Sequence, residues 1–454
     1  MSQTVAVLDI GKTNVKLALF SDGRLLWEKS APNRVLAGPP YPHEDVESAW
    51  TFFIDALREA ARTHQISAIV PTAHGAAGAL IGESELAAPV MDYEFEGVDA
   101  IEPDYARLRP SFSESLSPKL PAGLNVGRQL AYQKWRCPDL FADARYFVGY
   151  PQYWTWRLSG VAVSEVTSLG AHTDLWAPRR GQVSSLVKAL GVDHLLPPLR
   201  RAFDPLGPIR PEIAALTGLA PETQVFCGIH DSNASLLPYL VSRQAPFTVL
   251  STGTWVILMC LGLSLDHLDP CDDTLANVDA LGRPIACGRF MGGREYATIA
   301  GSAGNPDLDA IERVIASGAM ALPCFSGQGG PYATTKGVIR GDVATHDRAA
   351  LATLYCALVA DLMLTRMGAG SGDLIVEGSF AGNLPFCQTL GALRTRQRIF
   401  AARDAAGTAR GAAMLAHWPP SYSITAPTPV ETISIAGLDA YREGWTAALT
   451  SPTL

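Results

Sequence analysis

Residues 5–20 read VAVLDIGKTNVKLALF, and residues 247–262 read FTVLSTGTWVILMCLG. Each stretch is an apolar run, a short polar turn with a glycine, and a second apolar run, which is the pattern of two strands joined by a tight turn. The second copy opens the second half of a chain of 454 residues, a length for which two domains are the default. We therefore predict a duplicated fold with a domain boundary at residues 238–246.

The segments that surround these two copies predict a mixed α/β chain. Apolar residues at helical spacing predict a helix over residues 50–61. A long amphipathic helix with one apolar face is predicted from Leu351, Leu354, Tyr355, Leu358 and Leu362. The other predicted elements are strands at residues 25–29, 66–70, 225–227, 374–376 and 398–401, helices from residue 234 and over 410–417 and 435–449, and an extended Pro-rich connector over 419–429.

The bulk composition narrows the class of protein. Hydrophobic residues make up 48% and charged residues 18% of the chain, as in an ordinary globular enzyme. The net charge of −8, without a block of like charges, argues against a nucleic-acid partner. The apolar runs fall short of the ~20 residues that span a bilayer, and the first residues lack the features of a signal peptide. We therefore expect a cytoplasmic protein without a membrane partner.

Eight cysteines are spread along the chain without a CxxC pair or a Cys/His cluster. Isolated cysteines of this kind usually pack as small buried hydrophobic residues. We therefore expect reduced thiols and no structural zinc.

Two polar turns are candidate sites for phosphate. A glycine lets backbone N–H groups approach an anion, and hydroxyl and ammonium groups add donors. The first turn comprises Gly11, Lys12, Thr13, Asn14 and Lys16, and the second comprises Ser251, Thr252, Gly253 and Thr254. Asp9, at the end of the first strand, can hold Mg²⁺ through water because hard cations prefer oxygen ligands. Either turn alone is equally well an ordinary hairpin, but two such turns heading the two halves can grip a triphosphate from both sides.

A third motif, GIHDSNA at residues 228–234, follows a predicted strand and precedes a predicted helix. At such a position Asp231 is either the N-cap of the helix or a general base that removes the proton of a sugar hydroxyl. Phosphoryl transfer requires little covalent chemistry from the protein, so one positioned carboxylate, one metal ion and phosphate donors suffice.

The motifs DIGKTNVK (9–16), GIHDSNA, LSTGTW (250–255) and LIVEGSFAGN (374–383) occur in the order and spacing of the FGGY carbohydrate kinases. The chain resembles this family, which belongs to the sugar kinase, heat-shock chaperone and actin superfamily, from Val5 to about Ala416. The resemblance implies an α/β fold of two actin-like (ribonuclease H-like) lobes with a catalytic cleft between them. Residues 1–240 are then the N-terminal lobe with the sugar site and the first phosphate turn, and residues 241–454 are the C-terminal lobe with the ATP site and the second phosphate turn.

The resemblance also implies roles for single residues. Asp231 matches the catalytic base and, with Asp9, is a candidate ligand of Mg²⁺. Residues 72–75 match a loop that contacts the sugar. The residues expected at the substrate are His74, Gly75, Tyr153, His230, Asp231 and Trp255, although core packing is the more common role of such aromatic residues. Glu165 and Thr167 fall where the family has sugar-lobe residues near the cleft.

Gly378, Ser379 and Asn383 match the loop that binds adenosine in the family. The chain departs from the family there, because the usual Gly-Gly-Gly-Ser stands as VEGSF at residues 376–380 and the asparagine is displaced by about a residue. The acidic residue that usually precedes the last small-residue helix has no clear counterpart unless it is Asp404. The adenine contacts are therefore less firmly implied than the phosphate sites.

The resemblance implies an enzyme that uses ATP and Mg²⁺ to phosphorylate a small sugar. The GIHDSNA and LSTGTW pair is similar to the L-fuculose and L-rhamnulose kinase branch, so a ketose of that kind is the favoured substrate. The GKTN start differs from typical rhamnulokinases, which keeps D-xylulose, D-ribulose and L-xylulose open. A nucleotide-driven binding protein with the same lobes is the alternative, but Asp231 and the short chain after Ala416 favour the kinase. Many relatives are dimers, so a homodimer also stays open.

Overall fold

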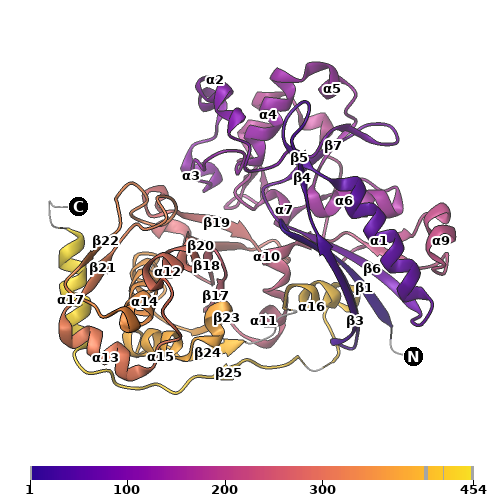
Figure 1. Cartoon of the computed structure of the whole chain (residues 1–454). Coiled ribbons are helices and arrows are strands. Elements are labelled where there is room, and N and C mark those ends of the chain that lie inside the picture. The colour runs from indigo at the N-terminus through magenta and orange to yellow at the C-terminus, as the bar shows by residue number, and fades with distance from the viewer. Residues whose placement is uncertain (1–2, 403–406, 423, 451–454) are drawn as a thin grey trace. The chain divides into compact units, whose positions relative to one another are not determined.

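The computed structural model describes residues 3–402, 407–422 and 424–450. The chain forms two units of mixed α/β structure, whose elements are labelled in Figure 1. The first unit comprises Met1–Ser242, Ala276–Pro284 and Ala406–Ile424, and the second comprises Arg243–Leu275, Ile285–Ala405 and Thr425–Leu454. A sheet of seven strands forms the centre of each unit.

The sheet of the first unit has the order β14-β15-β6-β1-β2-β3, with β16 also beside β6. β1 pairs antiparallel with β2 and parallel with β6, and β6 pairs parallel with β15 and β16. The strands are β1 (Thr4–Ile10), β2 (Asn14–Ser21), β3 (Arg24–Pro32), β6 (Ile66–Ala73), β14 (Pro205–Pro208), β15 (Gln224–Phe226) and β16 (Ile229–His230). The strand–turn–strand predicted at residues 5–20 is confirmed.

Helices cover both faces of this sheet. Leu8 of β1 lies in one hydrophobic cluster with Phe53 of α1 (Val46–Ala61). Val7, the preceding residue, points to the opposite face and lies in a second cluster with Met414 of α16 (Gly407–Met414). Because successive side chains of a strand point to opposite faces, β1 is buried on both sides. The candidate polar residues therefore have room only at the ends of the central strands.

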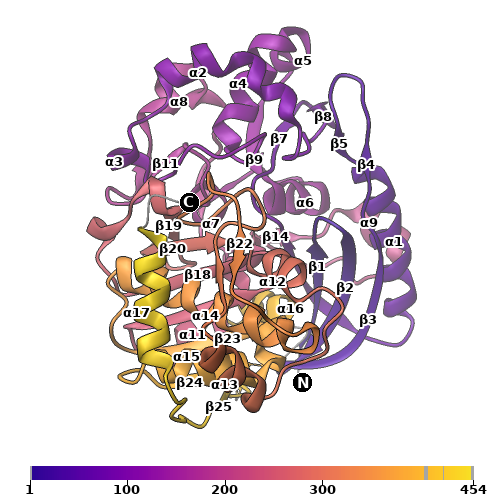
Figure 2. The ribbon, with the colours of Figure 1, turned by 60° about the vertical axis from the view of Figure 1, so that its left-hand side comes forward.

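The second unit repeats this pairing in a sheet with the order β19-β20-β18-β17-β23-β24-β25. β17 pairs antiparallel with β18 and parallel with β23, as β1 does with β2 and β6. The strands are β17 (Phe247–Thr252), β18 (Val256–Leu261), β19 (Thr274–Val278), β20 (Pro284–Phe290), β23 (Asp373–Gly378), β24 (Ile399–Ala402) and β25 (Thr428–Pro429). The shared pairing confirms the predicted duplication, and Figure 2 shows this sheet and its helices from another side.

Helix α14 (Arg348–Arg366) differs from the prediction of a single apolar face. Every residue from Ala349 to Leu364 is buried except Leu362. The helix contacts α12 (Gly292–Ala300), α13 (Leu308–Ser317) and α15 (Leu384–Leu393). Little of its surface therefore faces water. Thr345–Arg366 is long and apolar enough to cross a membrane, but 83% of its apolar window is buried inside the protein. We therefore describe α14 as a core helix.

Two segments that the sequence placed in the C-terminal lobe, Ala276–Pro284 and Ala406–Ile424, belong to the first unit. The Asn233 side-chain amide donates to the Val278 carbonyl at 2.6 Å. α16 approaches the same region so closely that a Cβ on Gly411 would lie 1.9 Å from the Ala234 carbonyl oxygen. These contacts explain why a division of the chain into two continuous lobes fails, and the chain returns to the second unit before α17 (Leu438–Leu449).

Candidate active site

Three neighbouring strands of the first unit end at the predicted sugar and base motifs. Asp9 of β1 is in register with Thr72 of β6, and Ala73 of β6 is in register with His230 of β16. The strands are parallel, so their carboxyl ends meet at the same edge of the sheet. A Cβ on Gly75 would lie 2.6 Å from His230 Nε2, so a larger residue here would displace the buried His230 ring. The fold thus brings together three segments that lie far apart in sequence.

Asp231 is the first residue of the short helix α10 (Asp231–Ala234), which begins three residues before the helix predicted from the sequence. The N-cap is His230, and its side chain forms no capping hydrogen bond, so the N-cap interpretation of Asp231 is wrong. The Asp231 Oδ1 atom accepts the Ser232 N–H at 2.5 Å and lies 3.2 Å from His230 Nε2. The carboxylate is 29% exposed, so it is held by its neighbours and still reaches solvent.

The Asp9 carboxyl lies close enough to Asp231 for the two charges to repel. The pKa of Asp9 is raised to about 7, first by burial and then by the Asp231 carboxylate, while Lys16 opposes the shift. Lys16 stands opposite Asp9 in the β1–β2 register. Mg²⁺ is bound in proteins by one or two carboxylates completed by water and phosphate oxygens. Asp9 and Asp231 fit such a cation, which would relieve their repulsion.

His74 lies directly after β6 and faces the aromatic residues Tyr93 and Tyr150, with ring centroids 5.5 and 5.1 Å away. Its Nδ1 atom lies 2.9 Å from the Gly75 carbonyl oxygen. Within the described part of the chain, the buried Nε2 atom has no hydrogen-bond partner, and the nearest carboxylate oxygen, of Glu44, is 3.7 Å away. An unpaired buried polar atom is costly, so His74 Nε2 is a candidate for a substrate hydroxyl.

Lys12, expected at phosphate, is instead engaged inside the first unit. Its ammonium group pairs with Glu44 at 3.2 Å and with Asp92, and it lies 4.6 Å from the centroid of the Tyr93 ring. Glu44 is only 1% exposed, so Lys12 neutralises a buried charge. Asp92 and the pairing of Glu44 were not predicted from the sequence, because they lie 80 and 32 residues from Lys12 and no local pattern marks them.

The remaining residues of the first turn form the predicted hairpin. The Gly11 N–H donates to the Asn14 carbonyl at 2.9 Å. The Asn14 side-chain amide donates to the Thr13 hydroxyl at 3.2 Å, and both side chains are exposed. Thr13, Asn14 and the side chain of Lys16 are therefore the polar groups of this turn that are placed to meet a ligand.

The second turn follows β17 and splits into structural and exposed residues. The Thr252 hydroxyl donates to the Glu377 carbonyl at 2.5 Å and accepts the Phe380 N–H at 2.8 Å. Its single proton is thus committed to the protein. Gly253 and Thr254 are exposed, Ser251 is half-buried, and the turn rests on α12, where a Cβ on Gly293 would lie 2.0 Å from the Gly253 oxygen. Gly253 and Thr254 are the free end of the turn.

The loop expected at adenosine begins at Gly378, whose φ of +79° and close approach to Thr252 require glycine. A Cβ at this position would lie 1.9 Å from the Thr252 carbonyl oxygen, to which the Ser379 hydroxyl donates at 3.4 Å. Asn383 caps α15, because its side-chain oxygen accepts the Phe386 N–H at 3.1 Å. The amide of Asn383 therefore has a structural partner. Asp404 lies outside the described residues.

The two aromatic residues expected at the substrate lie in packed surroundings. Tyr153 is 2% exposed, stacks on Tyr150 at 6.3 Å, and accepts a hydrogen bond from Arg157 at 3.0 Å. The structure does not bring Tyr153 to the site, because it faces the core side of α6 (Tyr150–Ser159). Trp255 of the second unit lies 4.8 Å from the Arg289 guanidinium and against Gly329. Packing explains the position of Tyr153, whereas Trp255 is half-buried.

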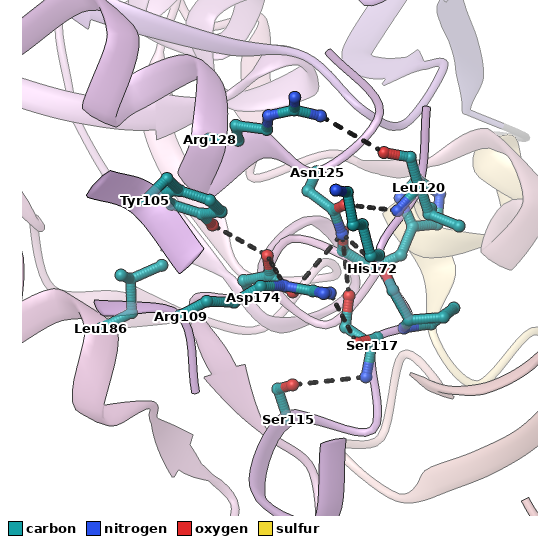
Figure 3. Close-up of polar contacts among 12 residues, drawn as sticks. Tyr105, Arg109, Ser115, Ser117, Leu120, Asn125, Arg128, His172, Asp174 and Leu186 are labelled. Atoms are coloured by element: carbon teal, nitrogen blue, oxygen red, sulfur yellow. Dashed lines mark hydrogen bonds and ion pairs between the residues drawn. The ribbon is translucent and has the colours of Figure 1, made fainter. Parts of the chain in front are cut away.

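A buried polar network holds the backbone next to the loop at residues 72–75. The Gln129 side-chain amide donates at 2.6 Å to the carbonyl of Ala76, just after the loop, and at 2.6 Å to that of Gly123. Figure 3 shows the adjoining network, in which Asp174 accepts from Tyr105 at 2.8 Å and from Arg109 at 2.9 Å. Asn125 ties the same network to residues 117, 118, 120 and 172. These partners were not predicted from sequence, since each depends on the packed fold.

Comparisons with known proteins give the class to which this arrangement belongs. Residues 124–238 match the N-terminal domain of the FGGY family of carbohydrate kinases, and residues 244–424 match the C-terminal domain of carbohydrate kinase FGGY. The crystal structure of a carbohydrate kinase from Novosphingobium aromaticivorans is 36% identical over 100% of both chains, with a TM-score of 0.91. The chain belongs to the FGGY family of carbohydrate kinases.

Other relatives are similar over a shorter range or in fold alone. L-fuculokinase from Haemophilus influenzae is 31% identical over 149 residues, which cover 31% of this chain and 29% of the L-fuculokinase. A ligand-bound xylulose kinase from Lactobacillus acidophilus is 14% identical over 98% of this chain and 97% of its own, with a TM-score of 0.80. At that identity the likeness confirms the two-lobed actin-like fold and says nothing about the substrate.

Proposed function

We propose that this kinase transfers the γ-phosphate of ATP to a hydroxyl of a small ketose, with Asp231 as the general base. The observation that carries the proposal is the meeting of Asp9, the His74–Gly75 loop and Asp231 at the ends of three adjacent strands. One carboxylate beside a sugar-binding loop and a second carboxylate for a cation meet the small demands of phosphoryl transfer.

In this mechanism His74 and the backbone around Gly75 hold the sugar. The acceptor hydroxyl loses its proton to Asp231 as its oxygen bonds to the γ-phosphorus, the bond to the β,γ-bridging oxygen breaks, and ADP leaves. Ser232 and His230 hold Oδ1 of Asp231, which orients the carboxylate toward the acceptor. Mg²⁺, held by Asp9 through water and by Asp231, would neutralise phosphate charge when bound.

The nucleotide phosphates are assigned to the two glycine turns. Gly11, Thr13, Asn14 and Lys16 supply donors from the first turn, and Ser251, Gly253 and Thr254 supply donors from the second. The bonding of Lys12 and Thr252 to the protein supports their omission from this set. Gly378, Ser379 and Asn383 keep the adenosine assignment that the family implies, although Gly378 and Asn383 also have structural roles.

An L-fuculose- or L-rhamnulose-like ketose is the proposed substrate. The partial similarity to L-fuculokinase supports it. The test is ADP release from Mg-ATP, with kcat/KM compared across L-fuculose, L-rhamnulose, the pentuloses, D-fructose and glycerol. We expect one of the deoxyketoses to be preferred, but a missing hydroxyl that is met by apolar surface contributes only about 1–3 kcal/mol of discrimination, so related ketoses should also be used. If kcat/KM for a pentulose or glycerol exceeds that for both deoxyketoses by more than tenfold, the substrate assignment is wrong. ADP release without sugar favours a nucleotide-driven binding protein.

Asp231→Asn tests the base directly. We expect kcat to fall by roughly 10²–10⁴, the usual contribution of a general base, while the fold and much of the binding of sugar and Mg-ATP are kept. Folding is checked by thermal unfolding and binding by calorimetry. A folded variant with wild-type kcat removes Asp231 from the mechanism.

We also propose that the enzyme acts in the cytoplasm. All eight cysteines lie in the described part of the chain and none is in a disulfide, which supports a reducing compartment. Six are buried, and Cys271 is exposed.

A further inference from the structure

The segment that leads to Asp231 lies outside the regular strand pairing. β15 ends at Phe226 and β16 begins at Ile229, so the sheet is interrupted at Cys227 and Gly228. Gly228 has a φ of +81°, and a Cβ there would lie 2.5 Å from the Pro71 carbonyl oxygen. Buried backbone groups at such a break need partners from elsewhere. The position of Asp231 therefore depends on side chains that bond to this segment.

Helix α6 supplies the first set of partners. The Thr155 hydroxyl lies 3.1 Å from the Phe226 carbonyl oxygen and 3.0 Å from that of Cys227. The Gln152 amide donates to the carbonyls of Cys227 and Gly228 at 3.2 and 3.3 Å. These bonds hold the carbonyl groups that precede β16, but they do not reach the residues next to the base.

Thr167 of α7 (Val166–Leu169) holds the backbone next to the base. The His230 N–H donates to the Thr167 hydroxyl oxygen at 3.1 Å. The same hydroxyl lies 2.6 Å from a carboxylate oxygen of Glu165, to which it donates its only proton. The direction of this chain is thus fixed: His230 donates to Thr167, and Thr167 donates to Glu165.

Glu165 is an unusual residue for a helix cap. Its Oε2 atom accepts the N–H groups of Thr167 and Ser168 at 3.0 and 3.1 Å in addition to the Thr167 hydroxyl. Glu165 is 0% exposed, and among the described residues its Oε1 atom has no hydrogen-bond partner. Burial raises the pKa of the carboxyl to about 7, against the effect of these hydrogen bonds. An uncharged or exposed cap would avoid the desolvation cost of a buried carboxyl, so the acid needs a further explanation.

We propose that Glu165 and Thr167 are positioning residues of the phosphoryl transfer: Glu165 fixes the Thr167 hydroxyl, and this hydroxyl fixes the His230 backbone and with it the Asp231 carboxylate. The 2.6 Å bond to Glu165 takes the only proton of the hydroxyl, which leaves its oxygen as the acceptor for the His230 N–H. The His230 ring adds a second restraint, because its Nδ1 atom lies 2.8 Å from the Asn233 side-chain oxygen. The proposal rests on the proposed role of Asp231 as the base.

Thr167→Val, which keeps the shape and removes the hydroxyl, is the main test. We expect kcat to fall by roughly 10- to 100-fold, as for a small misplacement of a reacting group, while KM for sugar and Mg-ATP changes by less than about threefold. Thr167→Ser restores the hydroxyl and should restore kcat. Thr217→Val is the matched control, because Thr217 is as deeply buried but bonds its own helix at the Ile213 carbonyl. Wild-type kcat in folded Thr167→Val overturns the proposal.

Hydrogen exchange gives a readout that does not depend on catalysis. The peptide over residues 226–234 should exchange about tenfold faster in Thr167→Val than in Thr217→Val, because the His230 amide loses its acceptor. Unchanged exchange overturns the proposal whatever the activity. If Thr167→Val does not fold, Thr167→Ala, which also removes the hydroxyl, takes the same measurements with the same criteria. Wild-type kcat in Asp231→Asn together with faster exchange in Thr167→Val means that the base assignment, and not the positioning contact, is wrong.

Discussion

Lys12 and its partners show how a single side chain can take a different role from the one that its place in a motif indicates. Its side chain is 20% exposed, while those of Glu44 and Asp92 are 1% and 9% exposed. Removing the ammonium would leave two nearly buried carboxylates without their cation. The cost of such a change is usually larger than the gain from forming the pair.

Lys12→Met should therefore lower the free energy of unfolding by about 3 kcal/mol, the lower end of the range for a broken buried pair. KM for Mg-ATP should change by less than about threefold. Lys29→Met is the control, because the Lys29–Glu59 pair is 45% and 49% exposed and should contribute less than about 1 kcal/mol. Unchanged stability with a tenfold higher KM for Mg-ATP contradicts this role and returns Lys12 to the phosphate site.

Glu165 also predicts a pH dependence of stability. Its pKa in the folded protein, about 7, is above the ordinary 4.5, so the folded state binds the proton more tightly than the unfolded state. The resulting stabilisation is complete below about pH 4.5 and is lost as the pH rises through 7. Glu165→Gln removes this dependence. We measure the free energy of unfolding in urea at pH 5 and pH 8. The difference between the variant and the wild type should shift in favour of the variant by up to roughly 3 kcal/mol from pH 5 to pH 8.

The control for this measurement is Glu83→Gln, in which an exposed acid of the same unit is neutralised. We expect the difference in free energy of unfolding between this variant and the wild type to change little from pH 5 to pH 8. A difference for Glu165→Gln that is independent of pH means that Glu165 keeps its ordinary pKa.

Among the structural elements, the two glycines near the second turn have opposite environments. Gly378 lies at the end of β23 with positive φ and no room for a side chain, since its Cβ would meet the Thr252 carbonyl at 1.9 Å. Around Gly253 the nearest atom to a Cβ is 4.0 Å away. Gly378 lies where β23 packs closely on β17, and Gly253 forms an exposed surface of the turn.

Gly378→Ala should therefore cost more than 2 kcal/mol of stability, from strain at positive φ and from the parting of β17 and β23. Gly253→Ala should leave the thermal midpoint within a few degrees and raise KM for Mg-ATP, because its methyl group obstructs a phosphate. Thermal unfolding and steady-state kinetics separate the two outcomes. A Gly253→Ala enzyme with wild-type KM removes this turn from the phosphate site.

The same elements show which parts of the fold could be predicted from the sequence. The strand–turn–strand units at β1–β2 and β17–β18 were predictable because apolar periodicity and glycine turns are local signals. The helix α14 was predicted, but its burial on all sides was not, because that burial comes from α12, α13 and α15, which lie elsewhere in the sequence. The partners of Lys12 and Thr252 lie 32, 80, 125 and 128 residues away, so only the folded chain brings them together. The placing of Asp231 at the end of a strand was predicted, but its support by Thr167 was not.

For the molecule as a whole, the proposal that both glycine turns bind one nucleotide predicts that variants of either turn weaken the use of Mg-ATP to a similar extent. Lys16→Ala in the first unit and Thr254→Ala in the second should each raise KM for Mg-ATP by about tenfold, a typical loss for one charged or polar contact. Sugar affinity measured without nucleotide should stay within about threefold of the wild type. Equal loss of sugar and nucleotide binding in either variant points to a purely structural hairpin.

The interleaving of the two units along the chain bears on how the protein is made. The face of the first sheet that carries Val7 is covered by α16, which is encoded after almost the whole second unit. During translation this face of the first sheet lacks α16 until Gly407–Met414 have left the ribosome. A fragment that stops at Ser242 would keep this face exposed and would be prone to aggregate. The first unit is therefore completed only by residues that are encoded after most of the second unit, although each unit carries its own glycine turn.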